Sequence, residues 1–139
     1  MICMQNNQNI QPAETAQKSL IKDTVRRIDQ VQKEATLQNA CDRCEDSLFT
    51  SLYNTRPVSF YLCSGSAYTV LNPATQTPTT LFRIEDVRGD GVVLRILVQD
   101  GDAVTCTNFT TVLSLDCVCG LQCFAPICCE ECTSGCNNA

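Results

Sequence analysis

The side chains best suited to chemistry in this chain are its cysteines, of which there are 12 in 139 residues, alongside no histidine. A cysteine content this high in a short chain is typical of a disulfide scaffold. Disulfides persist in oxidising surroundings, yet residues 1–9 are polar and lack the basic and apolar regions of a secretory signal peptide. We therefore expect a protein that is made in a reducing cytosol and is cross-linked later, when its surroundings become oxidising.

The densest group of thiols lies in the segment Asp116–Cys123, at Cys117, Cys119 and Cys123. Side chains at positions i and i+2 of a strand stand on the same face, so Cys117 and Cys119 are poorly placed to bond to each other. The nearby leucines share their parity: Leu113, Leu115 and Leu121. Because free cysteine often behaves as a small buried hydrophobe, we expect Cys117 and Cys119 to be buried core cysteines.

A second group of thiols lies towards the two ends of the chain. Cys3 stands in an Asn/Gln-rich arm, and the polar tail carries Cys128, Cys129, Cys132 and Cys136. Thiols on chain ends can reach neighbouring molecules without meeting a fixed internal geometry. We expect these five cysteines to form inter-subunit disulfides.

Zinc binding is the main alternative use of the thiols. Cys41-x-x-Cys44 and Cys129-x-x-Cys132 have the spacing of a four-thiolate zinc site. The separation between the two pairs is much longer than in a zinc ribbon, and no histidine can serve as a ligand. A redox enzyme is disfavoured, because Cys41 follows the predicted helix whereas the reactive cysteine of a redox C-x-x-C motif lies at a helix N-terminus.

Several other classes of function find no support in the residues. Without histidine, a serine or cysteine nucleophile lacks its usual base, and no glycine-rich phosphate loop occurs. We therefore predict neither an enzyme nor a cofactor. A net charge of −5 without tryptophan disfavours nucleic-acid binding. No apolar run approaches the roughly 20 residues that span a bilayer, so we also expect no membrane contact.

Sequence periodicity predicts the elements that position these cysteines. A helix over residues 13–39 is predicted by apolar side chains that recur every three or four residues: Ile21, Val25, Ile28, Val31 and Ala35. Such an apolar stripe can pack either against its own domain or against a neighbouring subunit, and we slightly favour packing against a neighbouring subunit.

After Pro57 the period changes to two, so Cys63 falls on the face opposite Phe60 and serves either between subunits or not at all. Asp90-Gly91 stands between two β-type runs and predicts a hairpin, and residues 99–102 form the next turn. Short strands joined by tight turns indicate an antiparallel sandwich or small barrel of about six strands.

The predicted fold is therefore α+β and mainly β. One long N-terminal helix precedes an antiparallel β-sandwich or small barrel, and a Cys-rich tail follows. The expected segments are a disordered arm at 1–11, an amphipathic helix with the Cys41/Cys44 segment at 12–56, a β domain at 57–124 and the tail at 125–139.

Four segments of the chain carry a family resemblance: Asn54–Pro57, Leu81–Val87, Val92–Leu97 and Asp116–Cys123. On these segments the chain resembles the CotY/CotZ spore coat proteins of endospore-forming bacteria, which include the exosporium protein ExsY. The Asp-Cys-x-Cys-x-x-x-Cys run is the most specific of the four. The resemblance implies a structural protein that self-assembles into an ordered, disulfide-cross-linked layer or fibre of the spore coat or exosporium.

The resemblance also implies synthesis in the mother-cell cytoplasm without a signal peptide. The implied partners are further copies of the chain and other spore coat or exosporium proteins. A zinc-binding structural adaptor and a disulfide-stapled monomeric binding domain stay open as alternatives, which metal content and oligomeric state would distinguish.

Overall fold

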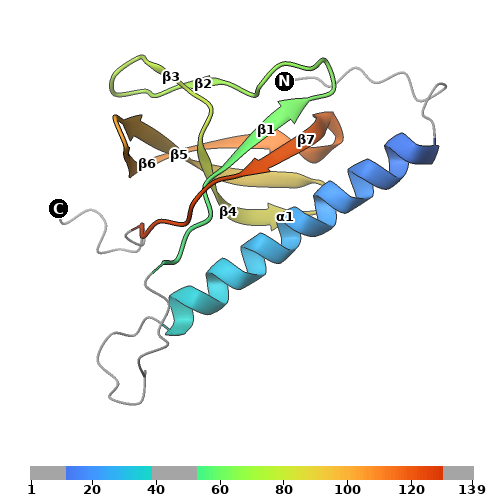
Figure 1. Cartoon of the computed structure of the whole chain (residues 1–139), viewed down its shortest axis with the longest axis horizontal. Coiled ribbons are helices and arrows are strands. Elements are labelled where there is room, and N and C mark those ends of the chain that lie inside the picture. The colour runs from blue at the N-terminus through green and yellow to red at the C-terminus, as the bar shows by residue number, and fades with distance from the viewer. Residues whose placement is uncertain (1–11, 39–52, 130–139) are drawn as a thin grey trace.

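A long helix, α1 (Pro12–Gln38), packs against an antiparallel sheet in the computed structural model, which describes residues 12–38 and 53–129 (Figure 1). Proline suits the first helical position, where its missing N–H has no intrahelical partner to lose. The predicted helix over residues 13–39 is confirmed to within one residue at each end. The elements that follow are β1 (Val58–Leu62), β2 (Val70–Leu71), β3 (Pro78–Thr79), β4 (Phe82–Arg88), β5 (Gly91–Asp100), β6 (Ala103–Ser114), the 3-10 helix η2 (Leu115–Cys117) and β7 (Val118–Cys123).

The strands form one antiparallel sheet in the order β6-β5-β4-β1-β7, and β2 pairs with β3 in a small separate sheet. Both predicted turns are confirmed, with Gly89 (φ 58°) between β4 and β5 and Gly101 (φ 62°) between β5 and β6. Glycine adopts this left-handed conformation without the steric cost of a side chain. The fold is α+β and mainly β, as predicted. Within the described residues, the edge strands β6 and β7 do not pair, so the sheet is not a closed barrel.

The main core lies between α1 and the inner faces of the strands. β1 and β4 share a single registered pair, Val58↔Phe82, so the β1/β7 pair diverges from β4, β5 and β6 beyond that point. Phe82 stands at the centre of the core, with its ring centroid 6.4 Å from that of Phe60 and 5.3 Å from that of Tyr68. Full burial of an aromatic or branched aliphatic side chain stabilises a fold by about 1.5–3 kcal/mol, so this cluster supplies much of the driving force for folding.

Helix α1 docks the first half of its apolar stripe on its own sheet. Ile21 is 7% exposed and Val25 is fully buried, and both belong to the main core. The preference for a neighbouring subunit as the partner of this stripe is therefore wrong for these residues. Further along the helix, Val31 is 45% exposed.

Polar contacts hold the second half of α1. The buried Gln32 donates from Nε2 to Ile84 O at 2.6 Å and accepts the N–H of Arg56 on Oε1 at 3.0 Å. Lys33 Nζ lies 2.8 Å from Asp86 Oδ1 on β4. The helix is thus joined both to the sheet and to the strand-like segment that leads into β1.

The short helix η2 changes the register of the last strand. The sequence pattern treats residues 110–121 as one β-type run, whereas the structure inserts η2 between β6 and β7. Ser114 caps this turn, since its Oγ accepts the N–H of Asp116 at 3.3 Å. A 3-10 turn has three residues per turn, so the period of two is interrupted and Val118, rather than Cys119, is fully buried.

Candidate cross-linking site

The disulfide Cys63–Cys119 joins the end of β1 to the start of β7, with the two Cα atoms 4.7 Å apart. Beside this bridge, the N–H of Cys63 donates to Cys117 O at 3.0 Å. Two predictions are corrected here: Cys63 is bonded within the chain, and Cys119 is only half-buried. The cause is a register irregularity between Tyr61 and Leu62 together with the η2 turn, since both break the alternation on which the predictions rested.

A second disulfide, Cys106–Cys129, joins β6 to the segment beyond β7, with the Cα atoms 5.7 Å apart. Cys129 is 4% exposed. The prediction that Cys129 cross-links subunits is therefore wrong, because its sulfur is bonded inside the chain. The same bond removes Cys129 from the proposed zinc ligands, since a disulfide sulfur offers no thiolate.

The segment around Cys129 is held by specific contacts that its composition does not reveal. Asn54 donates from Nδ2 to Cys129 O at 2.6 Å and accepts the N–H of Cys129 on Oδ1 at 2.8 Å. Thr55 and Ile127 exchange two main-chain hydrogen bonds of 3.1 and 2.9 Å. A second apolar cluster lies beneath, formed by Leu81, Leu97 and Cys129 with Val104, Cys106 and Ile127. The folded domain therefore continues to Cys129, past the predicted boundary at residue 124.

Cys117 and two exposed thiols complete the described cysteines. Cys117 is buried, 3% exposed, as predicted, and it is disulfide-bonded rather than free. Cys123 and Cys128 are free and exposed. We predicted inter-subunit bonds for Cys128 but not for Cys123. The place of Cys123 at the end of β7, opposite Val58, is visible only in the structure. The other predicted site residues, Cys3, Cys41, Cys44, Cys132 and Cys136, lie outside the described residues.

A buried polar network fastens the segment before β1 to the outer face of the sheet. Arg83 and Arg95 are registered partners on β4 and β5, and each places a nitrogen 2.8 Å from Glu85 Oε1. Arg83 Nε also donates to Thr55 Oγ1 at 2.8 Å. Buried charges are tolerated when they are paired and hydrogen-bonded, and here the pairing positions Asn54, which in turn holds Cys129. The network thus supports the Cys106–Cys129 bridge.

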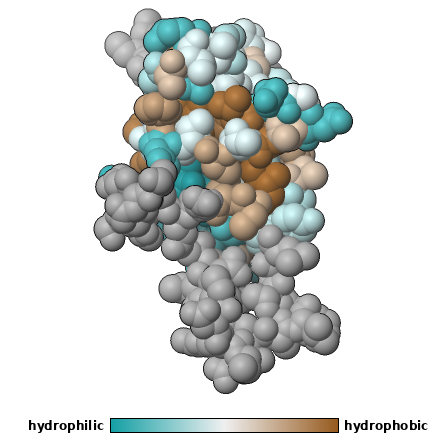
Figure 2. Space-filling view, turned by 90° about the vertical axis from the view of Figure 1, so that its left-hand side faces the viewer, coloured by the Kyte–Doolittle hydropathy of each residue, from teal (hydrophilic) through white to brown (hydrophobic). Residues whose placement is uncertain are grey.

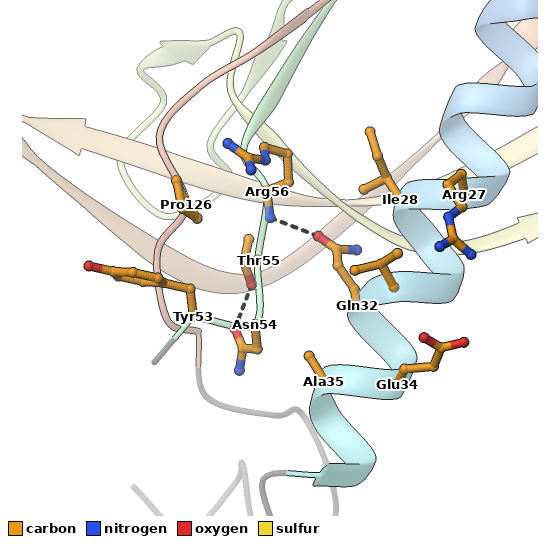
Figure 3. Close-up of a pocket in the computed structure, with 11 residues that line it drawn as sticks. Arg27, Ile28, Gln32, Glu34, Ala35, Tyr53, Asn54, Thr55, Arg56 and Pro126 are labelled. Carbon is orange, nitrogen blue, oxygen red and sulfur yellow. Dashed lines mark hydrogen bonds between the residues drawn. The ribbon is translucent and has the colours of Figure 1, made fainter. Parts of the chain in front are cut away.

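A groove of about 490 Å³ separates α1 from the segment before β1 (Figure 3). Its apolar wall includes Ile28 and Val31, and Gln32 spans it through the hydrogen bond to Arg56 that Figure 3 draws. Among the described residues that line it, no cysteine or histidine occurs. Across residues 12–38 and 53–129, no group of three or more potential metal ligands is present.

The fold and its cysteines define a class of protein: a disulfide-stapled α+β domain that keeps free thiols on its surface. No protein-family model, curated protein or solved structure shows significant similarity to the chain. In the part of the chain that the structure describes, no helix has the length and apolar character needed to cross a membrane.

Proposed function

We propose that this chain is a structural protein that self-assembles into an ordered layer or fibre and is then locked by inter-subunit disulfides. The carrying observation is the pair of exposed free thiols, Cys123 and Cys128, on a domain whose other described cysteines are bonded. A subunit with one exposed thiol can only form a dimer, whereas a subunit with two can bond to two neighbours and extend a polymer.

The two thiols stand on a fixed surface. Phe124, between them, donates its N–H to Pro57 O at 2.9 Å and accepts a hydrogen bond from the guanidinium of Arg56 at 2.9 Å. Each inter-subunit bond forms when two thiols lose two protons and two electrons to an oxidant such as glutathione disulfide, which is reduced to two thiols. Because the thiols are held in place, such bonds favour a regular lattice over random cross-linking.

The resemblance to the CotY/CotZ family supports the spore coat or exosporium as the location of this lattice. The chain would then be synthesised in the mother-cell cytoplasm, and its partners would be other copies and other spore coat or exosporium proteins. Late oxidation in that setting accounts for the high cysteine content.

The test compares three forms of the full chain, each reduced and then oxidised with glutathione disulfide. We expect the native sequence to give multimers on a non-reducing gel, ordered sheets or fibres by electron microscopy, and monomer after dithiothreitol. Replacing Cys123 and Cys128 together by serine should shorten the multimers severalfold. The matched control replaces Cys63 and Cys119 by serine and should form multimers as long as those of the native sequence. Monomers alone from the native sequence, or unchanged multimers from the Cys123/Cys128 variant, would contradict the proposal.

A zinc-binding adaptor is the competing proposal, and the Cys106–Cys129 bond argues against it because it leaves three of the four expected ligands. Zinc content of protein purified without chelator distinguishes the two functions. We expect well under one zinc per chain, and one zinc per chain with no multimers would favour the adaptor.

A further inference from the structure

The two described disulfides differ in their access to solvent. In the bridge between Cys63 and Cys119, Cys63 is exposed and Cys119 is half-buried. In the bridge between Cys106 and Cys129, Cys106 is half-buried and Cys129 is 4% exposed. A disulfide is broken by a thiolate that reaches one of its two sulfur atoms, so access decides which bridge reacts. Of these four bonded cysteines, Cys63 is therefore the most accessible point of attack.

The free thiol Cys123 stands at the opposite end of the β1/β7 pair from this bridge. Cys123 is the last residue of β7 and is registered opposite Val58, the first residue of β1. Cys63 directly follows the last residue of β1, five residues beyond Val58. A strand rises about 3.4 Å per residue, so the two ends of the pair lie about 17 Å apart. Two cysteines bond only when their Cα atoms lie within about 7 Å of each other, so Cys123 cannot attack the bridge of its own chain.

The second free thiol, Cys128, lies farther from the bridge than Cys123 does. Beyond β7 the chain continues alongside the segment before β1, where the N–H of Ile127 donates to Thr55 O at 2.9 Å. In Figure 1, β1 points to the upper right and β7 returns to the left, so the ends of these two strands are on opposite sides of the domain. A thiol that attacks Cys63 must therefore come from another molecule.

Apolar surface accompanies the free thiols. Phe124 follows Cys123 and is 37% exposed. Figure 2 looks onto the left-hand side of Figure 1, towards which β7 runs, and shows apolar surface across the middle of that side. Exposed apolar surface favours contact with other molecules. The side of the domain towards which β7 runs is therefore suited to an encounter with a partner.

We propose that the Cys63–Cys119 bridge is a thiol-exchange site, at which an exposed thiol of another molecule replaces Cys119. The attacking thiolate forms a new disulfide with Cys63 Sγ, and the bond between Cys63 and Cys119 breaks. Cys119 Sγ leaves with the electron pair of that bond and takes up the proton that the attacking thiol has lost. The numbers of disulfides and of thiols stay the same, so the step needs no oxidant.

In the assembly, the attacking thiol belongs to Cys123 or Cys128 of another copy. This part of the inference rests on the proposed function and adds an oxidant-free route to inter-subunit bonds. Each link joins the thiol end of one copy to the bridge end of the next, and repetition of such a heterologous contact extends a chain of subunits. The net charge of −5 slows the encounter, but the link needs no stable non-covalent dimer because its product is covalent. A small thiol such as glutathione shares this chemistry, and the tests separate the two sources.

The first test incubates freshly purified full chain under argon with a chelator and without oxidant. We expect multimers on a non-reducing gel while the number of titratable thiols per chain stays constant, because oxidation would consume two thiols per bond. Mass spectrometry of the digested multimers should find Cys63 joined to Cys123 or Cys128. Replacing Cys63 and Cys119 by serine should lower the amount of multimer at least tenfold here. As the control, the same variant should still form multimers when glutathione disulfide is added.

The second test supplies the small thiol. Native chain is first treated with iodoacetamide to block its free thiols, is then exposed to reduced glutathione, and is finally labelled with N-ethylmaleimide. We expect glutathione on Cys63 and N-ethylmaleimide on Cys119, each at least tenfold more often than on Cys106 or Cys129, because the second bridge is less accessible.

The two tests have distinguishable outcomes. Glutathione on Cys63 without oxidant-free multimers would support the exchange site and identify a small thiol as its partner. Glutathione on Cys129 as often as on Cys63, with no link from Cys63 to another copy, would overturn the inference, while multimers formed with glutathione disulfide would still support the assembly function. Monomers in every sample, with or without oxidant, would overturn the assembly function, and glutathione on Cys63 would still support the exchange site.

Discussion

At the scale of single residues, the structure concentrates its constraints on the segment that ends at Cys129. Asn54 supplies both hydrogen bonds to the Cys129 main chain through one carboxamide, which mimics a strand pairing at a single point. The disulfide to Cys106 then closes this contact covalently. The free neighbour Cys128 is exposed, so adjacent residues have opposite roles, one internal and one available to a partner.

Replacing Cys129 by serine should lower the free energy of unfolding. The bond spans 23 residues, and closing a loop of that size contributes roughly 3 kcal/mol by restricting the unfolded chain. Chemical denaturation under non-reducing conditions measures the loss, and thiol titration should find Cys106 newly free. Cys128→Ser is the control and should unfold at the native denaturant concentration. Equal stability of the two variants would contradict this assignment.

Replacing Gln32 by leucine should also be destabilising. The change removes the shorter of two side-chain hydrogen bonds on Ile84 O and leaves the part-buried N–H of Arg56 without its acceptor. An unsatisfied buried group costs about 1–3 kcal/mol. Urea denaturation at pH 7 measures the effect. Gln30→Leu is the matched control, because Gln30 is exposed and bonds only within its own helix, so its effect should stay within about 0.5 kcal/mol. A Gln32 variant as stable as the control would show that these two hydrogen bonds do not stabilise the fold.

At the scale of elements, ion pairs orient α1 on the sheet. Lys22 Nζ lies 2.8 Å from Asp116 Oδ1 and 3.2 Å from Asp90 Oδ1. The hydrogen bond to Asp116 raises the pKa of Lys22 above its ordinary 10.5. A raised lysine pKa contributes stability below pH 10.5, and that contribution is lost as the pH rises through the folded pKa. These contacts tie the helix to the β4–β5 turn and to η2.

Protonation of Asp86 at low pH weakens the contact between α1 and the sheet. Hydrogen bonds from Lys33 and then from Arg88 lower the pKa of Asp86 from 3.8 to about 2. The unfolded chain therefore takes up this proton at a higher pH than the folded chain, so stability falls as the pH drops from about 4 to 2. Asp86 is 34% exposed, and solvent screening reduces the contribution to about 1 kcal/mol.

The variant Asp86→Asn tests this loss of stability at low pH. Its free energy of unfolding should lie about 1 kcal/mol below that of the native sequence at pH 6. The difference should shrink steadily below pH 4 and be smallest near pH 2, where about half of the native carboxyl is protonated. Denaturation curves recorded at half-unit steps between pH 2 and 6 measure the gap. A gap that stays constant across this range would show that loss of packing, rather than loss of charge, causes the effect.

At the scale of the whole molecule, the net charge of −5 opposes every association between copies. Salt screens this repulsion, since the Debye length falls from about 30 Å at 0.01 M to about 8 Å at 0.15 M ionic strength. Screening of this repulsion makes association between copies stronger in salt.

Full-length protein whose free thiols are alkylated should therefore self-associate more tightly at 0.15 M than at 0.01 M salt. Sedimentation equilibrium at several protein concentrations gives the dissociation constant at each ionic strength. Weaker association at the higher salt concentration would show that ion pairs between copies outweigh the repulsion between their net charges.

Local features of the sequence are sufficient to predict α1 and the two glycine turns. A helical stripe and a left-handed turn depend on residues within a few positions of one another, so their signals survive in the linear sequence. The same reasoning predicts the α+β class and the burial of Cys117, and it fails at Cys119 because the η2 turn interrupts the alternation.

Only the tertiary structure determines which residues of the chain bond to or pack against one another. The bonds Cys63–Cys119 and Cys106–Cys129 span 56 and 23 residues, and spacing alone does not select one pairing of 12 cysteines. Gln32 stands four residues after Ile28, so the sequence places it on the apolar face of the helix. Its hydrogen-bond acceptor on β4, Ile84 O, cannot be predicted from the sequence. Which edge strand the helix contacts is likewise set by packing. Both edge strands carry β-type patterns, and only the three-dimensional structure places Gln17 Nε2 within 2.9 Å of Cys119 O on β7.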